Sequence, residues 1–152
     1  MSADQEPRTE RRGNYVRFTA IPGHQTDDDA RDRAVSAACC AWFEGIIDDF
    51  LRHPARGEGT GADREEVHGQ TFEAACRLHR VFGFPDNIEA GLRVGQLGSC
   101  SVRFEIGLFR AGEDKPVATG YVVRVFVAQA SGKPASLPAG LRARLAELVK
   151  SA

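Results

Sequence analysis

The sequence predicts an α+β fold in which an antiparallel sheet packs across one long helix. Apolar residues recur at helical spacing over residues 34–51, which indicates a helix with a wide buried face. Strand-forming residues dominate four later segments, at 67–82, 88–98, 101–110 and 117–128. In the third of these, Val102, Phe104 and Ile106 alternate with charged residues, as in a strand with one buried face. A helix followed by a run of strands is the order typical of an α+β domain.

The remaining elements follow from local signals. A short strand over residues 15–21 is rich in aromatic and β-branched residues and ends at Pro22-Gly23. The long helix ends at His53-Pro54, and residues 56–66, with three glycines and many charges, are expected to form an exposed loop. A last helix begins at Pro138, because proline is favoured in the first turn and leucines recur at helical spacing after it.

The length and composition indicate one globular domain. A chain of 152 residues can bury about two thirds of its unfolded surface in a single core. We therefore expect one domain over residues 14–150. Residues 1–13 are charged and lack an apolar run, so we expect them to form a disordered tail.

Charge and cysteine content disfavour several classes of function. The formal net charge is −1, and the arginines are scattered, which argues against a nucleic-acid partner. The four cysteines lack the paired spacing of zinc or redox sites, so we expect no metal and no cofactor. The adjacent Cys39 and Cys40 are expected to be buried residues of the long helix. The charged start of the chain does not resemble a signal peptide or membrane anchor, which predicts a cytoplasmic protein that does not bind membranes.

Three groups of residues together resemble one known family. Residues 84–109 form an expected hairpin around Gly98-Ser99-Cys100-Ser101, and Lys133-Pro134 follows the last strand. Near the start, Asp27-Asp28-Asp29 precede Trp42-Phe43-Glu44 on the long helix. In this order they resemble the hotdog-fold acyl-CoA thioesterases, in particular the 4-hydroxybenzoyl-CoA thioesterase branch. The resemblance implies a hotdog fold, in which the sheet wraps around the long helix. It also implies an enzyme that hydrolyses a thioester.

The resemblance implies that Asp29 is the catalytic carboxylate. It matches the second Asp of the family motif Asp-x-Asp-x-x-Gly-His-Val-Asn-Asn. A thioester carbonyl beside Ala34, at the helix N-terminus, would develop its negative charge against free backbone N–H groups. The alternative is structural, because an acidic run before a helix is also favoured as a cap.

The chain departs from the motif immediately after these aspartates. Asp32 stands in the place of the family glycine, and Arg33 in the place of the histidine. Arg33 could pair with Asp29 or Asp32, or it could bind a substrate carboxylate. The departure therefore supports a second hypothesis, a non-catalytic hotdog module that binds an acyl thioester or a protein partner after loss of the Gly-His-Val-Asn-Asn segment.

The resemblance also implies a site for the thiol carrier. Ser99 and Ser101 lie at the hairpin corner where relatives place the pantetheine arm and phosphates of coenzyme A, and Lys133 could supply positive charge. A tight β-turn that needs glycine for its geometry explains the corner equally well. The expected partner is acyl-CoA or an acyl-carrier thioester. A small sheet with open edges also predicts a homodimer or homotetramer.

Four other titratable residues are weaker candidates for functional groups. Glu44 on the helix is a less favoured catalytic carboxylate, and a cross-strand ion pair is the favoured explanation for Glu73. His24 lies in the loop before Asp27, and His79 lies on a strand, where a satisfied structural histidine is more common. No Ser-His or Cys-His arrangement suggests a different hydrolase mechanism.

Overall fold

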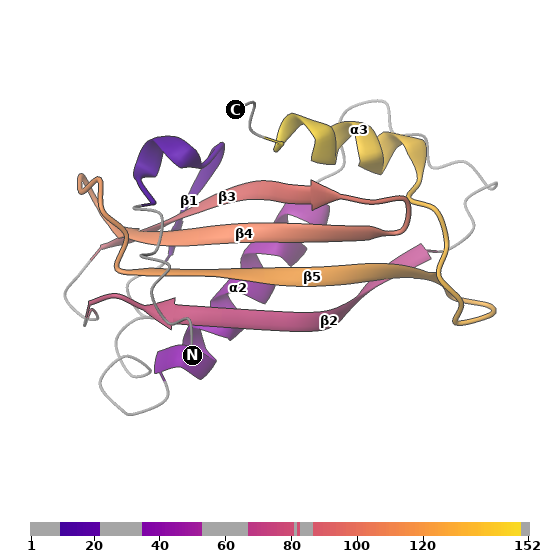
Figure 1. Cartoon of the computed structure of the whole chain (residues 1–152), viewed down its shortest axis with the longest axis horizontal. Coiled ribbons are helices and arrows are strands. Elements are labelled where there is room, and N and C mark those ends of the chain that lie inside the picture. Colours follow the sequence, from indigo (N-terminus) through magenta and orange to yellow (C-terminus); the bar gives the residue numbers. More distant parts are fainter. Residues whose placement is uncertain (1–9, 22–34, 53–66, 81, 83–86, 150–152) are drawn as a thin grey trace, which may run out of the picture.

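The computed structural model describes residues 10–21, 35–52, 67–80, 82 and 87–149. Within them the chain forms five strands, two α-helices and one short 3-10 helix (Figure 1). In chain order these elements are η1 (Arg12–Asn14), β1 (Arg17–Ile21), α2 (Val35–Arg52), β2 (Val67–Leu78), β3 (Ile88–Leu97), β4 (Ser101–Arg110), β5 (Ala118–Ala128) and α3 (Ala139–Glu147). The tail predicted for 1–13 lies mostly outside the described residues, and the domain limits stay a prediction.

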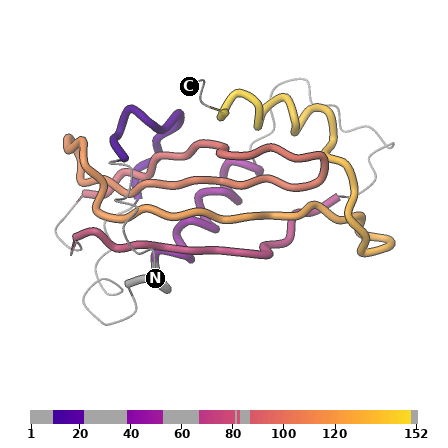
Figure 2. The backbone as a smooth tube through the Cα atoms, in the orientation of Figure 1, coloured from indigo at the N-terminus to yellow at the C-terminus, as the bar shows by residue number. Residues whose placement is uncertain are grey.

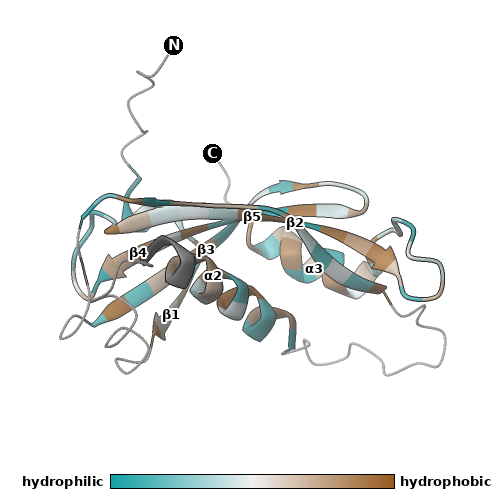
Figure 3. Ribbon diagram, turned by 90° about the horizontal axis from the view of Figure 1, so that it is seen from below, coloured by the Kyte–Doolittle hydropathy of each residue, from teal (hydrophilic) through white to brown (hydrophobic). Residues whose placement is uncertain are grey.

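The strands form one antiparallel sheet in the order β1-β3-β4-β5-β2. Helix α2 lies across one face of this curved sheet (Figure 3). The predicted α+β hotdog fold is therefore confirmed. The strands after the helix begin and end within a few residues of their predicted limits.

The core lies between α2 and the inner face of the sheet. The predicted alternation of β4 is confirmed, because Val102, Phe104 and Ile106 are buried whereas Arg103 and Glu105 are only half-buried. The helix residues that are buried in this core are Cys39, Trp42, Phe43, Ile47 and Phe50. A helix with this many buried apolar side chains is stabilised mainly by its packing on the sheet.

Gly120 on β5 allows α2 to approach the sheet closely. A Cβ atom at this position would lie 2.2 Å from the carbonyl oxygen of Ala75 and 2.5 Å from Cε2 of Phe43. These distances are far below a van der Waals contact, so only glycine fits between the helix side chain and strand β2.

The N-terminal residues pack on the outer face of the sheet. The ring of Tyr15 covers Gly91 and Gly107, which are paired across β3 and β4. Arg93 stacks on that ring at 4.8 Å and forms an ion pair with Glu10 at 3.0 Å. Burial raises the pKa of Tyr15 well above its ordinary value. The predicted first strand begins two residues later than expected because Tyr15 belongs to this outer layer.

Two arginines of helix α3 form hydrogen bonds that link the end of α2 to the turn between β3 and β4. Arg144 donates a hydrogen bond from Nη2 to the backbone carbonyl of Phe50 at 2.6 Å. Arg142 donates from Nη2 to the carbonyls of Gly98 and Ser99, at 2.6 and 3.3 Å. In the backbone trace, the same end of the sheet carries both α3 and the β3–β4 turn (Figure 2).

Candidate active site

The predicted catalytic segment precedes the first described turn of α2. Asp29, Arg33 and Ala34 lie outside the described residues, as do His24 and Asp32. The helix itself is described from Val35, and no acidic residue lies in its first turn. The positive end of the helix dipole therefore has no acidic partner within that turn.

The serine corner, Gly98 to Ser101, is a tight turn held by backbone hydrogen bonds. The N–H of Gly98 donates to the carbonyl of Ser101 at 2.8 Å, and a Cβ on Gly98 would lie 2.7 Å from the Ser101 hydroxyl. The carbonyl of Ser99 accepts from the N–H of Leu137 at 3.0 Å. The side chain of Ser99 is exposed, and Lys133 is exposed in the turn after β5. Ser99 is therefore accessible at the surface, whereas Ser101 is half-buried.

The serine corner and the described start of α2 lie at opposite ends of the sheet. The serine corner is next to the C-terminal end of α2, through the α3 contacts to Phe50. The N-terminal half of α2 packs at the other end, where Trp42 contacts Phe82 at 5.9 Å between ring centres. Because α2 has 18 residues, its ends are about 27 Å apart. Within a single chain, the structure does not bring the serine corner to the start of α2.

Glu44 is held in a polar cluster on the inner face. Its carboxylate accepts a hydrogen bond from the Thr71 hydroxyl at 2.6 Å and pairs with Arg124 of β5. Arg124 also pairs with Asp48 at 2.8 Å, and its side chain is only 6% exposed. Both carboxylate oxygens of Glu44 are thus engaged by donors, which indicates a structural role in joining α2 to β2 and β5.

Removing Glu44 should destabilise the fold more than removing Asp48. In Glu44→Ala the buried guanidinium of Arg124 keeps only Asp48, whose side chain is half exposed. We expect the free energy of unfolding to fall by about 2 kcal/mol in Glu44→Ala and by less than about 1 kcal/mol in Asp48→Ala, because an exposed ion-pair partner contributes little to stability. Thermal unfolding followed by circular dichroism measures both. Equal losses in the two variants would contradict this account.

Two other candidates have local structural partners. Glu73 accepts a hydrogen bond from the Tyr121 hydroxyl on the neighbouring strand, a cross-strand contact as predicted but with a tyrosine in place of a cation. His79 Nε2 lies 2.7 Å from the hydroxyl of Thr119. Burial, with smaller contributions from Arg77 and Arg80, lowers the pKa of His79 below its ordinary value.

The four cysteines are free thiols. Cys39 is fully buried, as predicted, whereas Cys40 is only half-buried. A hydrogen bond to Cys76, together with burial, raises the pKa of the Cys39 thiol, and the same hydrogen bond lowers the pKa of Cys76. Among the described residues, no group of three or more His, Cys, Asp or Glu side chains could hold a metal ion.

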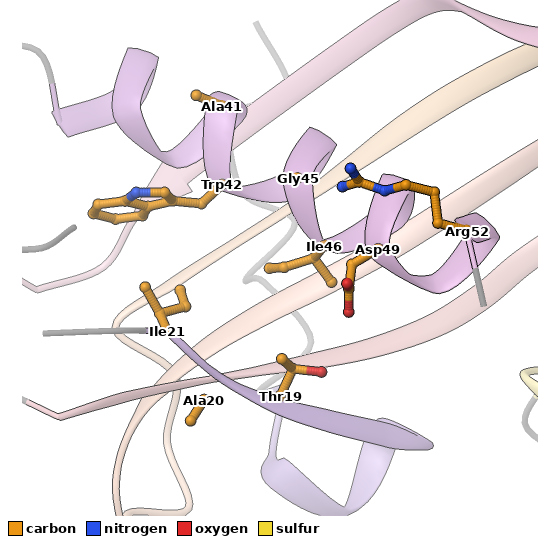
Figure 4. A pocket seen from close by; sticks show the side chains of 9 residues that line it. All are labelled: Thr19, Ala20, Ile21, Ala41, Trp42, Gly45, Ile46, Asp49 and Arg52. Carbon is orange, nitrogen blue, oxygen red and sulfur yellow. The ribbon is translucent and has the colours of Figure 1, made fainter. Parts of the chain in front are cut away.

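A groove between β1 and α2 was not predicted from the sequence. It has a volume of about 370 Å³, and its lining residues are Thr19, Ala20, Ile21, Ala41, Trp42, Gly45, Ile46, Asp49 and Arg52 (Figure 4). The helical spacing of Trp42 and Ile46 predicts only that they belong to the buried stripe of the helix. The signal in the sequence that could have indicated a groove is Gly45. A glycine within a helix lowers helix stability by about 1 kcal/mol relative to alanine, so its presence there suggests that the position needs a small residue.

Comparison with known proteins finds solved structures that share this fold. The chain matches no protein-family model and no curated protein. The PA5185 protein from Pseudomonas aeruginosa strain PAO1 is similar in structure, with a TM-score of 0.77 and 32% identity over 94% of this chain and 98% of that one.

Two named thioesterases share the fold at lower identity. The first is Slr0204, a 1,4-dihydroxy-2-naphthoyl-CoA thioesterase from Synechocystis (TM-score 0.68, 13% identity, 86% of this chain and 96% of that one). The second is a thioesterase from Thermus thermophilus, solved with coenzyme A and Zn (TM-score 0.60, 23% identity, 86% and 98%). The chain therefore belongs to the same family as the PA5185 protein and shares the hotdog fold of these two thioesterases.

One further finding concerns membranes. In the part of the chain that the structure describes, neither helix combines the length and apolar character needed to cross a bilayer.

Proposed function

We propose that this protein hydrolyses acyl-CoA thioesters by carboxylate-assisted attack of water at the N-terminus of α2. The observation that carries the proposal is the fold that the chain shares with thioesterases, one of which was solved with coenzyme A. Asp29, six residues before the first described residue of α2, is the proposed base or nucleophile. Free N–H groups at the helix start, next to Ala34, would stabilise the oxyanion, and Arg33 would contact the substrate.

The thiol carrier would bind at the serine corner of a second copy of the chain. Ser99 and Ser101 would hydrogen-bond the pantetheine arm, and Lys133 would contact a phosphate. Slr0204 is a 1,4-dihydroxy-2-naphthoyl-CoA thioesterase, and the Thermus thermophilus thioesterase was solved with coenzyme A, which supports acyl-CoA as the partner. Within one copy, the serine corner and the start of α2 lie at opposite ends of the sheet. A dimer in which the two sheets run antiparallel would place the corner of one copy next to the start of α2 in the other.

Strand β2 supplies the edge for this dimer. It is the last strand of the sheet, and its second edge pairs with no other strand in the described residues. Phe72, at a register shift in this strand, is 67% exposed, and Leu78 is 41% exposed. An open edge of 12 residues with exposed apolar side chains is a template for pairing with a second chain. Such an arrangement would give a homodimer, which could assemble further into a homotetramer.

Light scattering at micromolar concentration should show a dimer or larger species. Replacing Phe72 by Lys should shift the population toward the monomer, because a charge on an exposed edge opposes strand pairing. A wild-type protein that is a monodisperse monomer would contradict the dimer, and with it a site formed by the start of α2 in one copy and the serine corner of the other.

A steady-state assay on a panel of thioesters tests the proposed activity. Short, long and aromatic acyl-CoAs, with acyl carrier protein thioesters alongside, are incubated with the protein and thiol release is recorded. We expect saturable hydrolysis of at least one coenzyme A thioester. A cytoplasmic location, with reduced thiols and acyl-CoA pools, accords with this activity.

The departure from the family motif favours one alternative. With Asp32 and Arg33 in place of the motif glycine and histidine, the chain could bind an acyl thioester or a protein partner without turnover. A negative charge on Asp32 near the oxyanion would repel the negative charge that develops in the transition state and so slow hydrolysis. Binding of acyl-CoA in calorimetry, with no thiol release from any member of the panel, would favour this alternative.

A further inference from the structure

Two of the free thiols, Cys39 of α2 and Cys76 of β2, meet where the helix packs on the sheet. Cys76 pairs with Gly120 of β5, so its side chain points to the face of the sheet on which Phe43 of α2 packs. Cys39 is four residues before Phe43, on the same face of the helix. The two thiols form a hydrogen bond. The register of β2 and the buried face of α2 therefore bring these sulfur atoms together.

The two thiols differ in exposure and in acidity. Cys39 is fully buried, whereas Cys76 is half-buried and keeps part of its surface in contact with solvent. The hydrogen bond from Cys39 stabilises the thiolate of Cys76 and lowers the pKa of Cys76, while the same bond and burial raise the pKa of Cys39. A half-buried thiolate with a second thiol in contact is the arrangement in which oxidation proceeds to a disulfide.

We propose that Cys39 and Cys76 form a peroxide-sensitive thiol pair, in which Cys76 is oxidised and Cys39 closes a disulfide between α2 and β2. The thiolate of Cys76 attacks one oxygen of hydrogen peroxide, the O–O bond breaks and hydroxide leaves, which gives a sulfenic acid. The sulfur of Cys39 then attacks the sulfur of Cys76, the proton of Cys39 joins the leaving hydroxyl, and water is released. The two thiols lose two electrons, and the peroxide gains them. This thiol chemistry does not depend on the proposed hydrolysis.

The disulfide ties the first turns of α2 to strand β2. Cys39 is the fifth residue of α2, and Cys76 lies 37 positions later in the chain. A cross-link over this many residues restricts the unfolded chain and so stabilises the fold. We expect oxidation to raise Tm by about 5–10 °C and dithiothreitol to reverse the rise. Thermal unfolding followed by circular dichroism measures the change.

Peptide mass mapping after peroxide treatment identifies the bond. The whole protein is treated with hydrogen peroxide, the remaining thiols are blocked with N-ethylmaleimide in denaturant, and the protein is digested. Cys39 and Cys40 are adjacent and share a peptide, so the Cys40→Ser variant assigns the bond. We expect a linked pair of peptides that contain Cys39 and Cys76 and that dithiothreitol separates. Loss of the free Cys76 thiol should be at least about tenfold faster than loss of the Cys100 thiol.

Cys39→Ala and Cys100→Ala are the matched variants. Without Cys39, oxidation of Cys76 should stop at the sulfenic acid, which dimedone traps, and peroxide should not raise Tm. Cys100 lies at the serine corner, so Cys100→Ala should form the disulfide at the wild-type rate. Cys76→Ser changes a half-buried position and repeats the test if Cys39→Ala does not fold. In that variant the thiol of Cys39 should stay free after peroxide treatment.

Three results would overturn the proposal. The first is a wild-type protein in which Cys39 and Cys76 both stay free while Cys100 is oxidised. The second is a disulfide that disappears in Cys40→Ser, because the bond would then involve Cys40 in place of Cys39. The third is a disulfide between two copies of the chain, which a non-reducing gel would show as a doubled mass.

Discussion

Replacing Asp29 by Asn should lower kcat/KM on acyl-CoA at least 100-fold, which corresponds to about 2.7 kcal/mol of lost transition-state stabilisation. Positioned carboxylates that activate water or attack a carbonyl contribute effects of this size. An amide at the same position keeps the size and hydrogen-bonding capacity of the side chain but cannot accept the proton. Steady-state thiol release, with the substrate varied, measures the change.

Asp28→Asn is the matched control for this prediction. Both residues belong to the same acidic run, so a purely electrostatic effect on the helix dipole would be shared by the two variants. We expect Asp28→Asn to keep turnover within threefold of wild type, and both variants to keep Tm within a few degrees, since a cap contributes at most about 1–2 kcal/mol. Equal turnover in Asp29→Asn and wild type would move the chemistry away from Asp29.

Gly120→Ala should destabilise the fold by about 3 kcal/mol, because the new Cβ would overlap backbone as well as side-chain atoms. The carbonyl oxygen of Ala75, only 2.2 Å from the point where that Cβ would lie, belongs to the paired strand β2 and cannot rotate away. Either β2 or α2 has to move outward, which breaks ladder hydrogen bonds or opens the core around Phe43. At about 2–4 °C per kcal/mol, Tm should fall by roughly 6–12 °C.

Gly45→Ala provides the comparison for this substitution. It also places a methyl group on a glycine, but in open space on a helix, so we expect unchanged or slightly higher stability. Thermal unfolding of the two variants side by side separates close packing from a general effect of alanine. A Gly120→Ala protein as stable as wild type would show that the sheet can yield at this point.

Local pattern was enough to predict the sheet and the long helix. The alternation of Val102, Phe104 and Ile106 matches the buried face of β4, because a strand with one covered face reads directly in its sequence. The helical stripe through Trp42 and Phe50 likewise predicts α2 within a residue at each end. The strand and the helix depend mainly on residues that are close together in the chain, so their pattern can be read from the sequence.

Contacts between distant segments could not be predicted in this way. The pair of Glu44 and Arg124 joins residues 80 positions apart, and its existence depends on the register of β5 against α2. The placement of Tyr15 over the paired glycines depends in the same way on how the N-terminal segment crosses the sheet. The separation of the serine corner from the start of α2 follows from strand order, which a motif match does not specify.

Hydrolysis in ¹⁸O-enriched water tests the central proposal most directly. Wild-type protein is allowed many turnovers of an acyl-CoA, and the products are analysed by mass spectrometry. The account predicts that ¹⁸O enters the carboxylic acid product, with free coenzyme A formed in equal amount, and that Asp29→Asn forms neither above background. Wild-type protein that yields no labelled acid above the protein-free control, for any acyl-CoA tried, would contradict it.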